Sequence, residues 1–330
     1  MARIIPIATD KDRAEAITAA TEVLMRQRPV AIPTETVYGL AADATHPAAI
    51  TSIYETKGRP RFNPLICHMA DLAMAERNAV FDPLSRKLAE AFWPGPLTLV
   101  LPLQENSGIH PLATAGLDSV GIRVPVGFTA ELIRNLGRPL AAPSANSSGR
   151  ISPTTAQHVA ADLGQKIDVI IDGGACPVGV ESTIVKVEGG DVRLLRPGGI
   201  AVDAIEAVIG TVISRPKASG TAAIEAPGML ASHYAPDASV RLNATSVAQD
   251  EALIAFGSGD ISGAAGAKAL FNLSPVGDLA EAASNLFDYL KRADASGAKG
   301  IAVAAIPNEG LGEAINDRLM RAAAPRGTEE

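Results

Sequence analysis

Residues 33–40 read Pro33-Thr34-Glu35-Thr36-Val37-Tyr38-Gly39-Leu40. They follow a short apolar run, residues 30–32, which the proline ends, and hydroxyl groups and a carboxylate come directly after it. A strand that stops in this way delivers polar side chains at a point where backbone hydrogen bonding has ended. We therefore expect residues 30–32 to be a strand that ends at the mouth of a pocket.

A cluster of cations follows at residues 57–61, which read Lys57-Gly58-Arg59-Pro60-Arg61. It comes after a short helical pattern in which Pro47 is the expected first residue and Lys57 lies near the end. Hydroxyl groups beside clustered cations suit an anionic ligand such as a phosphate or a carboxylate. The alternative is a surface turn with solvated charges, because most charge runs face solvent.

The overall composition indicates a folded α/β protein. The chain has 330 residues, which predicts about two domains. Hydrophobic residues make up 47% and charged residues 20%, so the chain can bury large cores. Aromatic residues are only 4%, and the dominance of small aliphatic residues suits layers of helices packed on sheets.

Charge and cysteine content exclude some classes of protein. The net charge of −7 argues against a surface that coats nucleic acid, although a local basic cleft stays possible. Cys67 and Cys176 are far apart, and we expect both to be reduced thiols in the core. The chain shows no apolar run of 18 residues and no signal-peptide centre at its start, so we expect a soluble, cytoplasmic protein.

The first 210 residues alternate short apolar runs with helical patterns. Asp10 is the expected cap of a helix over residues 11–27, with Ala14, Ile17, Thr21 and Leu24 on one stripe. The turn at residues 188–191 predicts a hairpin, so the sheet should be at least partly antiparallel. The strand candidates are residues 30–32, 65–68, 97–101, 121–124, 140–142, 169–171, 183–187 and 192–195.

A polar, breaker-rich segment at about residues 211–238 is the best linker in the chain. Beyond it, strand candidates alternate with helical patterns, which indicates a small parallel βαβ sheet. These are strands at 240–242, 253–256, 269–273 and 301–306, and helices at 278–293 and 311–323. We predict an α/β protein with a twisted mixed sheet in residues 1–210, a linker at 211–238 and a small Rossmann-like domain at 239–330.

Familiar catalytic signatures are missing from this sequence. No P-loop and no GxSxG elbow is present, and the glycine-rich residues 257–263 are one residue too long for GxGxxG. We expect a simple turn there. The five histidines show no metal-ligand spacing.

Polar residues instead follow or interrupt strands throughout residues 30–200. Arg123 lies inside an otherwise apolar run and needs an anion, either an internal carboxylate or a ligand. The segment 144–149 closes another run with small hydrogen-bonding side chains, and Ser152 is expected to cap a helix that starts near Pro153. Polar side chains also stand at strand ends in residues 63–68, 181–183 and 196–198. With residues 33–40 these make six such elements in one domain, which indicates a site.

Several short motifs occur together in this chain. They are Thr34–Leu40, Lys57-Gly58-Arg59-Pro60, Asn63-Pro64-Leu65 with His68, Ser144-Ala145-Asn146, Glu181-Ser182-Thr183, Arg196-Pro197-Gly198, Pro227-Gly228-Met229 and His233-Tyr234-Ala235-Pro236. In order and spacing, the motifs up to residue 198 resemble a known family, the YrdC-like domain. The region with the last two motifs is similar to the linker of the longer, two-domain members of that family, the threonylcarbamoyl-AMP synthases.

The resemblance implies a nucleotidyl transfer. Members of the family make L-threonylcarbamoyladenylate and pyrophosphate from L-threonine, bicarbonate and ATP, for the threonylcarbamoyl modification of tRNA beside the anticodon. Such chemistry requires positioning and charge neutralisation rather than a covalent nucleophile. The resemblance also implies Mg²⁺ carried by the ATP phosphates with no metal ligand in the protein, and a downstream tRNA threonylcarbamoyl transferase complex as partner, without a need for direct tRNA binding.

The same resemblance assigns site residues. Tyr234 would close over the nucleotide as a lid, or alternatively would only pack the domain junction. The implied residues are Lys57 and Arg59 for catalysis, Arg59, Asn63, Ser119, Ser144, Asn146, Ser152, Arg196 and Tyr234 for ATP, and Thr34, Thr36, His68, Arg123, Ala142 and Ser182 for threonine.

Two other classes stay open at this point. One is a different ATP-dependent carbamoyl or amino-acid-activating enzyme that uses the same pocket. The other is a double-stranded RNA-binding protein, which Lys57, Arg59 and Arg61 taken alone would suggest. The acidic total charge weighs against the second class.

Overall fold

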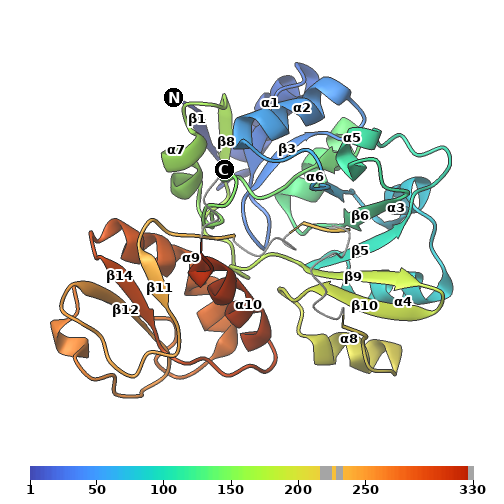
Figure 1. Cartoon of the computed structure of the whole chain (residues 1–330). Helices are drawn as coiled ribbons and strands as arrows, with labels where there is room; N and C mark the ends of the chain where they lie inside the picture. The colour runs from blue at the N-terminus through green and yellow to red at the C-terminus, as the bar shows by residue number, and fades with distance from the viewer. Residues whose placement is uncertain (216–224, 228–232, 326–330) are drawn as a thin grey trace.

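The computed structural model describes residues 1–215, 225–227 and 233–325 (Figure 1). Half of the linker predicted at residues 211–238 therefore lies outside the described residues. No helix in the described ranges is both long and apolar enough to span a membrane.

A ten-stranded mixed sheet forms the first part of the molecule. Its strands lie in the order β1-β8-β2-β3-β7-β4-β6-β5-β9-β10. Strands β4 and β6 pair in parallel, whereas β2 and β3 are antiparallel, which confirms the expected mixed sheet. The strands are β1 (Arg3–Pro6), β2 (Val30–Ile32), β3 (Gly39–Asp43), β4 (Ile66–His68), β5 (Leu97–Pro102), β6 (Ser119–Arg123), β7 (Leu140–Ala141), β8 (Val169–Asp172), β9 (Thr183–Glu188) and β10 (Asp191–Arg196).

All eight strands predicted in this region are present, with ends that differ by at most two residues. The predicted hairpin at residues 188–191 is also confirmed, because β9 and β10 pair antiparallel across it. The sequence analysis missed β1 and β3. Strand β1 buries only Ile5, and β3 reads GLAAD, whose glycine and alanines have weak strand preference.

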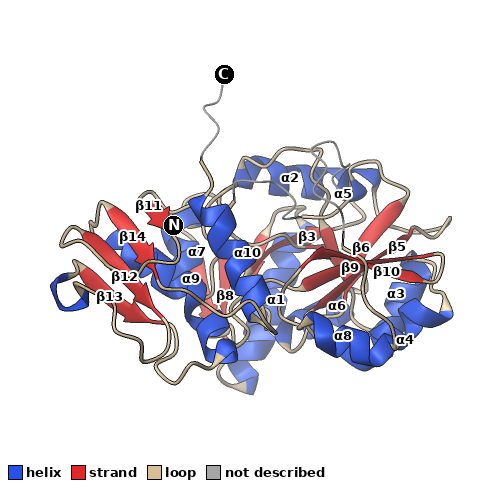
Figure 2. Cartoon of the chain, turned by 60° about the horizontal axis from the view of Figure 1, so that its bottom comes forward, coloured by secondary structure: helices blue, strands red, loops and turns tan. Residues whose placement is uncertain are grey.

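Helices cover both faces of this sheet. Figure 2 shows α2 and α5 on one side and α3, α4, α6 and α8 on the other. The helices are α1 (Asp10–Met25), α2 (Pro47–Lys57), α3 (Leu72–Asn78), α4 (Pro83–Phe92), α5 (Pro111–Thr114), α6 (Phe128–Leu136), α7 (Ala156–Leu163) and α8 (Val202–Ile209).

One prediction about helix α1 was wrong in detail. The N-cap is Thr9 rather than Asp10, because the Thr9 side chain accepts the Asp12 backbone N–H and Asp12 returns the contact in a capping box. Ala14 is exposed and Thr21 only half-buried. The buried stripe is Ala16, Ile17, Ala20, Val23 and Leu24.

A four-stranded parallel sheet forms the second part, as predicted. Its order is β11-β14-β12-β13. The elements are β11 (Ser239–Arg241), β12 (Glu251–Ala255), a 3₁₀ turn (Ala264–Gly266), β13 (Ala269–Asn272), α9 (Leu279–Ala295), β14 (Gly300–Val303) and α10 (Gly312–Ala323). The glycine-rich residues 257–263 form loop and turn after β12, as expected.

The two parts share an apolar cluster. Helices α9 and α10 lie between the small sheet and the large one in both views (Figures 1 and 2). Val37 and Val180, from loops of the first part, pack in one buried cluster with Phe287 of α9 and Leu319 of α10. The second part therefore contacts the loops of the first through its helices.

Candidate active site

The loop at residues 33–38 is held rigidly between β2 and β3. The Thr34 hydroxyl donates to the Val37 carbonyl at 2.6 Å, and the Tyr38 hydroxyl donates to the Gly174 carbonyl at 2.8 Å. Gly39 has little room for a side chain, since a Cβ there would lie 3.3 Å from the Ala142 Cβ. These contacts fix the loop against the neighbouring strand ends and confirm the expected site for polar side chains after β2.

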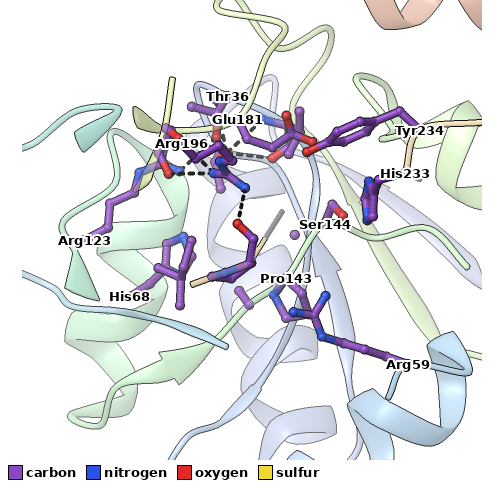
Figure 3. A pocket seen from close by; sticks show the side chains of 17 residues that line it. Thr36, Arg59, His68, Arg123, Pro143, Ser144, Glu181, Arg196, His233 and Tyr234 are labelled. Carbon is purple, nitrogen blue, oxygen red and sulfur yellow. Dashed lines mark hydrogen bonds between the residues drawn. The ribbon is translucent and has the colours of Figure 1, made fainter. Parts of the chain in front are cut away.

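A cavity opens beside this loop, and the empty space in it, open solvent included, is about 570 Å³. Figure 3 shows its side chains converging from separate elements, with Arg59 on one side and Arg123 and His68 on another. Ten of the predicted site residues line it: Thr34, Thr36, Arg59, His68, Arg123, Ala142, Ser144, Ser182, Arg196 and Tyr234.

Four further predicted residues lie in the wall behind the lining. The Lys57 ammonium donates to the backbone carbonyls of Ser144, at 2.5 Å, and of Asn146. Asn63 offers its carbonyl to Arg59. Ser152 donates its hydroxyl to Glu181 at 2.5 Å, so it does not cap a helix as predicted.

The cap of helix α7 is Thr155, whose side chain accepts the His158 backbone N–H. Ser152 does not cap this helix because residues 153–155, which follow it, are not helical.

Ser119 lies apart from these residues. It is the first residue of β6, whereas Arg123 is the last. At about 3.3 Å per residue the two are about 13 Å apart along the strand. Ser119 lines a separate cavity with Lys186 and Glu188. Its assignment to ATP stays a prediction that the geometry of the main cavity does not support.

Three buried cations at the cavity have only neutral partners. Arg59 donates to the carbonyls of Asn63 and Pro64, and Arg196 donates to the Ser182 carbonyl at 2.8 Å. In the described part of the chain, no carboxylate oxygen lies within 4 Å of a side-chain nitrogen of Lys57, Arg59 or Arg196. Burial lowers the pKa of Arg59 to about 10 and that of Lys57 well below its usual value.

Buried charges of this kind are costly unless an anion joins them. The alternative of a solvated surface turn is therefore wrong for Lys57 and Arg59 and holds only for Arg61, which is exposed.

Several buried polar atoms at the cavity have no hydrogen-bond partner within the described residues. These are Asn63 Oδ1, His68 Nδ1, Asn146 Oδ1, Arg196 Nε and His233 Nδ1. Such atoms are rare in folded proteins and cost free energy when left unpaired. Both donors and acceptors are among them, so a polar ligand with both kinds of group fits the cavity.

Arg123 forms an ion pair with a carboxylate of the protein itself, which is one of the two alternatives that the sequence left open. Its guanidinium lies 2.5 Å from the Glu35 carboxylate and donates to the Thr36 hydroxyl at 2.9 Å and to the Gly95 carbonyl at 3.1 Å. It still lines the cavity. A carboxylate ligand would meet a cation fixed at three points and shared with Glu35.

Comparisons with known proteins agree with this geometry. A family model described as telomere recombination, for the Sua5, YciO and YrdC proteins, matches residues 22–198. The chain belongs to this family. A second model, the threonylcarbamoyl-AMP synthase C-terminal domain, matches residues 200–324, so the chain is a member of the two-domain group, the threonylcarbamoyl-AMP synthases.

Individual members of the family cover nearly the whole chain. It is 40% identical to the threonylcarbamoyl-AMP synthase of Bacillus subtilis over 324 residues, which cover 94% of this chain and 93% of that protein. It is 41% identical to the Pyrococcus abyssi enzyme, over 90% and 91% of the two chains. The crystal structure of P. abyssi Sua5 complexed with L-threonine matches with a TM-score of 0.86 at 38% identity, over 98% and 97%.

Among the cavity residues that the sequence analysis did not assign to the site, two have ionisable side chains. These are Glu181 and His233, and both stand in the quoted motifs, directly before Ser182 and Tyr234. Burial alone would raise the pKa of the Glu181 carboxyl, but Arg318 and Arg196 hold it at about 2. Arg318 had no signal in the sequence, because it is one of two arginines in an ordinary amphipathic helical pattern.

The two histidines at the cavity predict a specific pH dependence of stability. Burial lowers the pKa of both His68 and His233 to about 3. In the unfolded chain each takes up a proton below about pH 6.5. Because the folded protein does not, lowering the pH from 7 to 5 should reduce the free energy of unfolding by about 2 kcal/mol per histidine.

Urea unfolding at the two pH values measures this loss. A variant with both His68→Gln and His233→Gln should lose about 4 kcal/mol less than the wild type between pH 7 and pH 5. An equal loss in the two proteins would show that these imidazoles do not stay neutral on folding. Glu181 does not interfere, since its own titration lies below pH 4.5.

Proposed function

We propose that this chain makes L-threonylcarbamoyladenylate and pyrophosphate from L-threonine, bicarbonate and ATP, for the threonylcarbamoyl modification of tRNA adenosine. The observation that carries the proposal is one cavity in which Arg59 and Arg196, buried with no carboxylate partner among the described residues, face Arg123, Thr36 and Ser182. Support also comes from a relative of known structure, which was crystallised with L-threonine. The cytoplasm, which holds ATP and tRNA, is the proposed place of action.

The reaction has two steps. The threonine amine attacks bicarbonate and water leaves, which gives a carbamate on the amino nitrogen. A carbamate oxygen then attacks the α-phosphorus of ATP, the bond to the β-phosphate oxygen breaks, and pyrophosphate departs. Both steps gather negative charge in one place, so fixed cations in a water-poor cavity lower the barrier.

The proposed roles follow from where the cations lie. Arg59 and Arg196 would bind the triphosphate, since both line the cavity and Arg196 Nε has no hydrogen-bond partner among the described residues. Lys57 would act through the segment it holds, because its ammonium is bound to the carbonyls of Ser144 and Asn146. That segment would present its side chains to the phosphates.

The threonine would lie on the other side of the cavity. Arg123 would bind its carboxylate, and the hydroxyls of Thr36 and Ser182 would contact its polar groups, with His68 nearby. His68 is neutral, since burial and Arg123 lower its pKa to about 3, so it can accept a hydrogen bond from the amine or the hydroxyl. Ala142 would border the methyl group.

We propose that Mg²⁺ enters with ATP, as part of that substrate. Within the described ranges no group of three or more histidine, cysteine or acidic side chains could hold a metal ion. The two carboxylates at the cavity, Glu35 and Glu181, are each paired with a buried arginine. The phosphate oxygens of ATP would supply oxygen ligands of the kind that Mg²⁺ prefers.

Pyrophosphate release tests the proposal. With ATP, Mg²⁺ and bicarbonate, release should depend on threonine, and kcat/KM for threonine should exceed that for serine by roughly 10-fold, because one buried methyl group contributes about 1 kcal/mol or slightly more. Equal rates with unrelated amino acids would favour the alternative of another amino-acid-activating enzyme. Retained activity without bicarbonate would have the same meaning.

The RNA-binding alternative has less support. Lys57 and Arg59 are buried, so they do not form an outward basic face. Any hand-over of the product to a tRNA threonylcarbamoyl transferase complex would need no direct tRNA contact by this chain.

A further inference from the structure

A fully buried arginine of the second part of the molecule contacts the wall of the cavity. Arg318 lies on α10, and its side chain has no exposed surface. Its Nε donates to the Glu181 carboxylate at 2.8 Å, and its Nη2 donates to the Pro197 carbonyl at 2.9 Å. Both partners belong to the first part of the chain, and Glu181 lines the cavity.

These contacts hold two neighbouring segments of the cavity wall together. Glu181 precedes Ser182, and Pro197 follows Arg196, while Arg196 donates to the Ser182 carbonyl at 2.8 Å. Arg318 therefore holds Glu181, which is next to Ser182, and Pro197, which is next to Arg196. The Glu181 carboxylate is fixed on its other oxygen as well, because it accepts the Ser152 hydroxyl at 2.5 Å.

Arg318 also supports the ring of Tyr234. The guanidinium carbon lies 5.4 Å from the ring centroid, and the ring stacks on Phe287 of α9 at the same centroid distance. Tyr234 has a φ of 63°, which is uncommon for a residue with a side chain. Residues of both C-terminal helices therefore determine where this ring of the lining lies.

The backbone confirms how closely the two parts meet. Gly179, in the loop that leads to Glu181, has a φ of 76°, and a Cβ there would lie 2.3 Å from the Ser284 Cα of α9. No side chain fits between this loop and the helix. The loop is therefore held at two points, by the backbone of α9 at Gly179 and by Arg318 of α10 at Glu181.

We propose that Arg318 is a positioning residue of the active site, through which the C-terminal domain holds Glu181, Arg196 and Tyr234 in the geometry that binds ATP. The proposal rests on the proposed function. It assigns a role to this domain in the reaction itself, because a triphosphate bound by Arg196 requires the segment 196–197 to stay in place. Truncating one member of a buried ion pair would also destabilise the fold, so the test must separate the two effects.

The first test compares Arg318→Met with the same variant carrying Glu181→Gln. Arg318→Met should lower kcat/KM for ATP by about 100-fold and lower the melting temperature, since Glu181 is left buried without its partner. Adding Glu181→Gln should recover much of the melting temperature but leave kcat/KM at least about 10-fold below the wild type. Recovery of both together would show a purely structural role and overturn the proposal.

Arg318→Lys provides a second test in case Arg318→Met does not fold. Lysine retains the charge but cannot donate to both Glu181 and Pro197 in the fork that arginine makes. We expect a melting temperature within a few degrees of the wild type and a loss of about 10-fold in kcat/KM for ATP. Unchanged kinetics would overturn the proposal. Arg292→Met, an exposed cation of α9, is the control and should change neither quantity.

A pair of glycine variants tests the domain contact independently. Gly179→Ala and Gly174→Ala lie in one loop and carry similar strain, with φ of 76° and 79°, but a Cβ at Gly174 meets nothing within 4 Å. Only Gly179→Ala should reduce kcat/KM for ATP, by about 10-fold or more. Equal kinetics in the two variants would contradict the inference.

ATP affinity, measured by calorimetric titration, separates this inference from the proposed function. If the wild type releases no pyrophosphate with threonine, the proposed function fails, but a weaker affinity of Arg318→Lys for ATP still supports positioning. If the wild type is active and the Arg318 variants match it in both assays, only the inference fails.

Discussion

Replacing Arg59 with methionine should lower kcat/KM for ATP by about 10²–10³-fold while leaving the fold intact. Arg59 is buried, lines the cavity and has no carboxylate partner among the described residues, so its charge is available to the phosphates. Without it, the negative charge that gathers as pyrophosphate leaves would lack one fixed cation.

Two opposing effects should leave the stability of this variant nearly unchanged. Burial lowers the pKa of Arg59 from its usual value to about 10, which corresponds to roughly 3 kcal/mol against the charged form. Removing the charge relieves this cost, but the carbonyls of Asn63 and Pro64 lose their donor, which costs about 1–3 kcal/mol. The melting temperature should therefore change by only a few degrees.

Arg61→Met is the matched control for this variant. Arg61 is two residues away in the same loop and exposed, so its loss should change kcat/KM by less than about 2-fold. Similar losses in the two variants would mean that the cluster acts only through its general charge. An active Arg59→Met protein would remove Arg59 from the phosphate site.

Replacing Arg123 with lysine should raise KM for threonine by about 100-fold with little change in KM for ATP. The guanidinium holds Glu35, Thr36 and Gly95 at once. A lysine ammonium could pair with Glu35 but not keep this geometry and also bind a carboxylate in a fork. Loss of charge-assisted hydrogen bonds of about 1.5–3 kcal/mol each accounts for the expected size.

We expect the melting temperature of Arg123→Lys to stay close to that of the wild type, because lysine keeps the positive charge opposite Glu35. Arg138→Lys serves as control, since Arg138 pairs with the buried Asp43 at 2.8 Å but does not line the cavity. It should leave both KM values unchanged. If Arg123→Lys affects ATP and threonine equally, the assignment of Arg123 to the threonine carboxylate is wrong.

Much of the fold could be predicted from local patterns. Val30–Ile32 followed by proline and hydroxyl groups gave a strand that ends at the cavity, and the turn at 188–191 gave a hairpin. Strand β3 could not be predicted in this way, because its alanines are in a strand only through burial between β2 and β7. Tertiary packing outweighs weak local preference there.

The candidate site, too, could be predicted only in part from local sequence patterns. Residues after strand ends, such as Thr36 and Ser144, reach the cavity because strand ends meet at one edge of a sheet. Ser119 is also a small hydroxyl residue, but it lies at the opposite end of its strand from Arg123. Arg318 could not be found from sequence, since its partner Glu181 is 137 residues away in the chain and only the docking of α10 joins them.

Fate of the bicarbonate carbon tests the account most directly. Pure protein would be incubated with radiolabelled bicarbonate, ATP, Mg²⁺ and threonine, and the products separated by chromatography. The account predicts label in a compound that also contains adenosine, formed in the same amount as pyrophosphate and only when all components are present. Pyrophosphate without label in an adenylate, or no product with threonine at all, would contradict it.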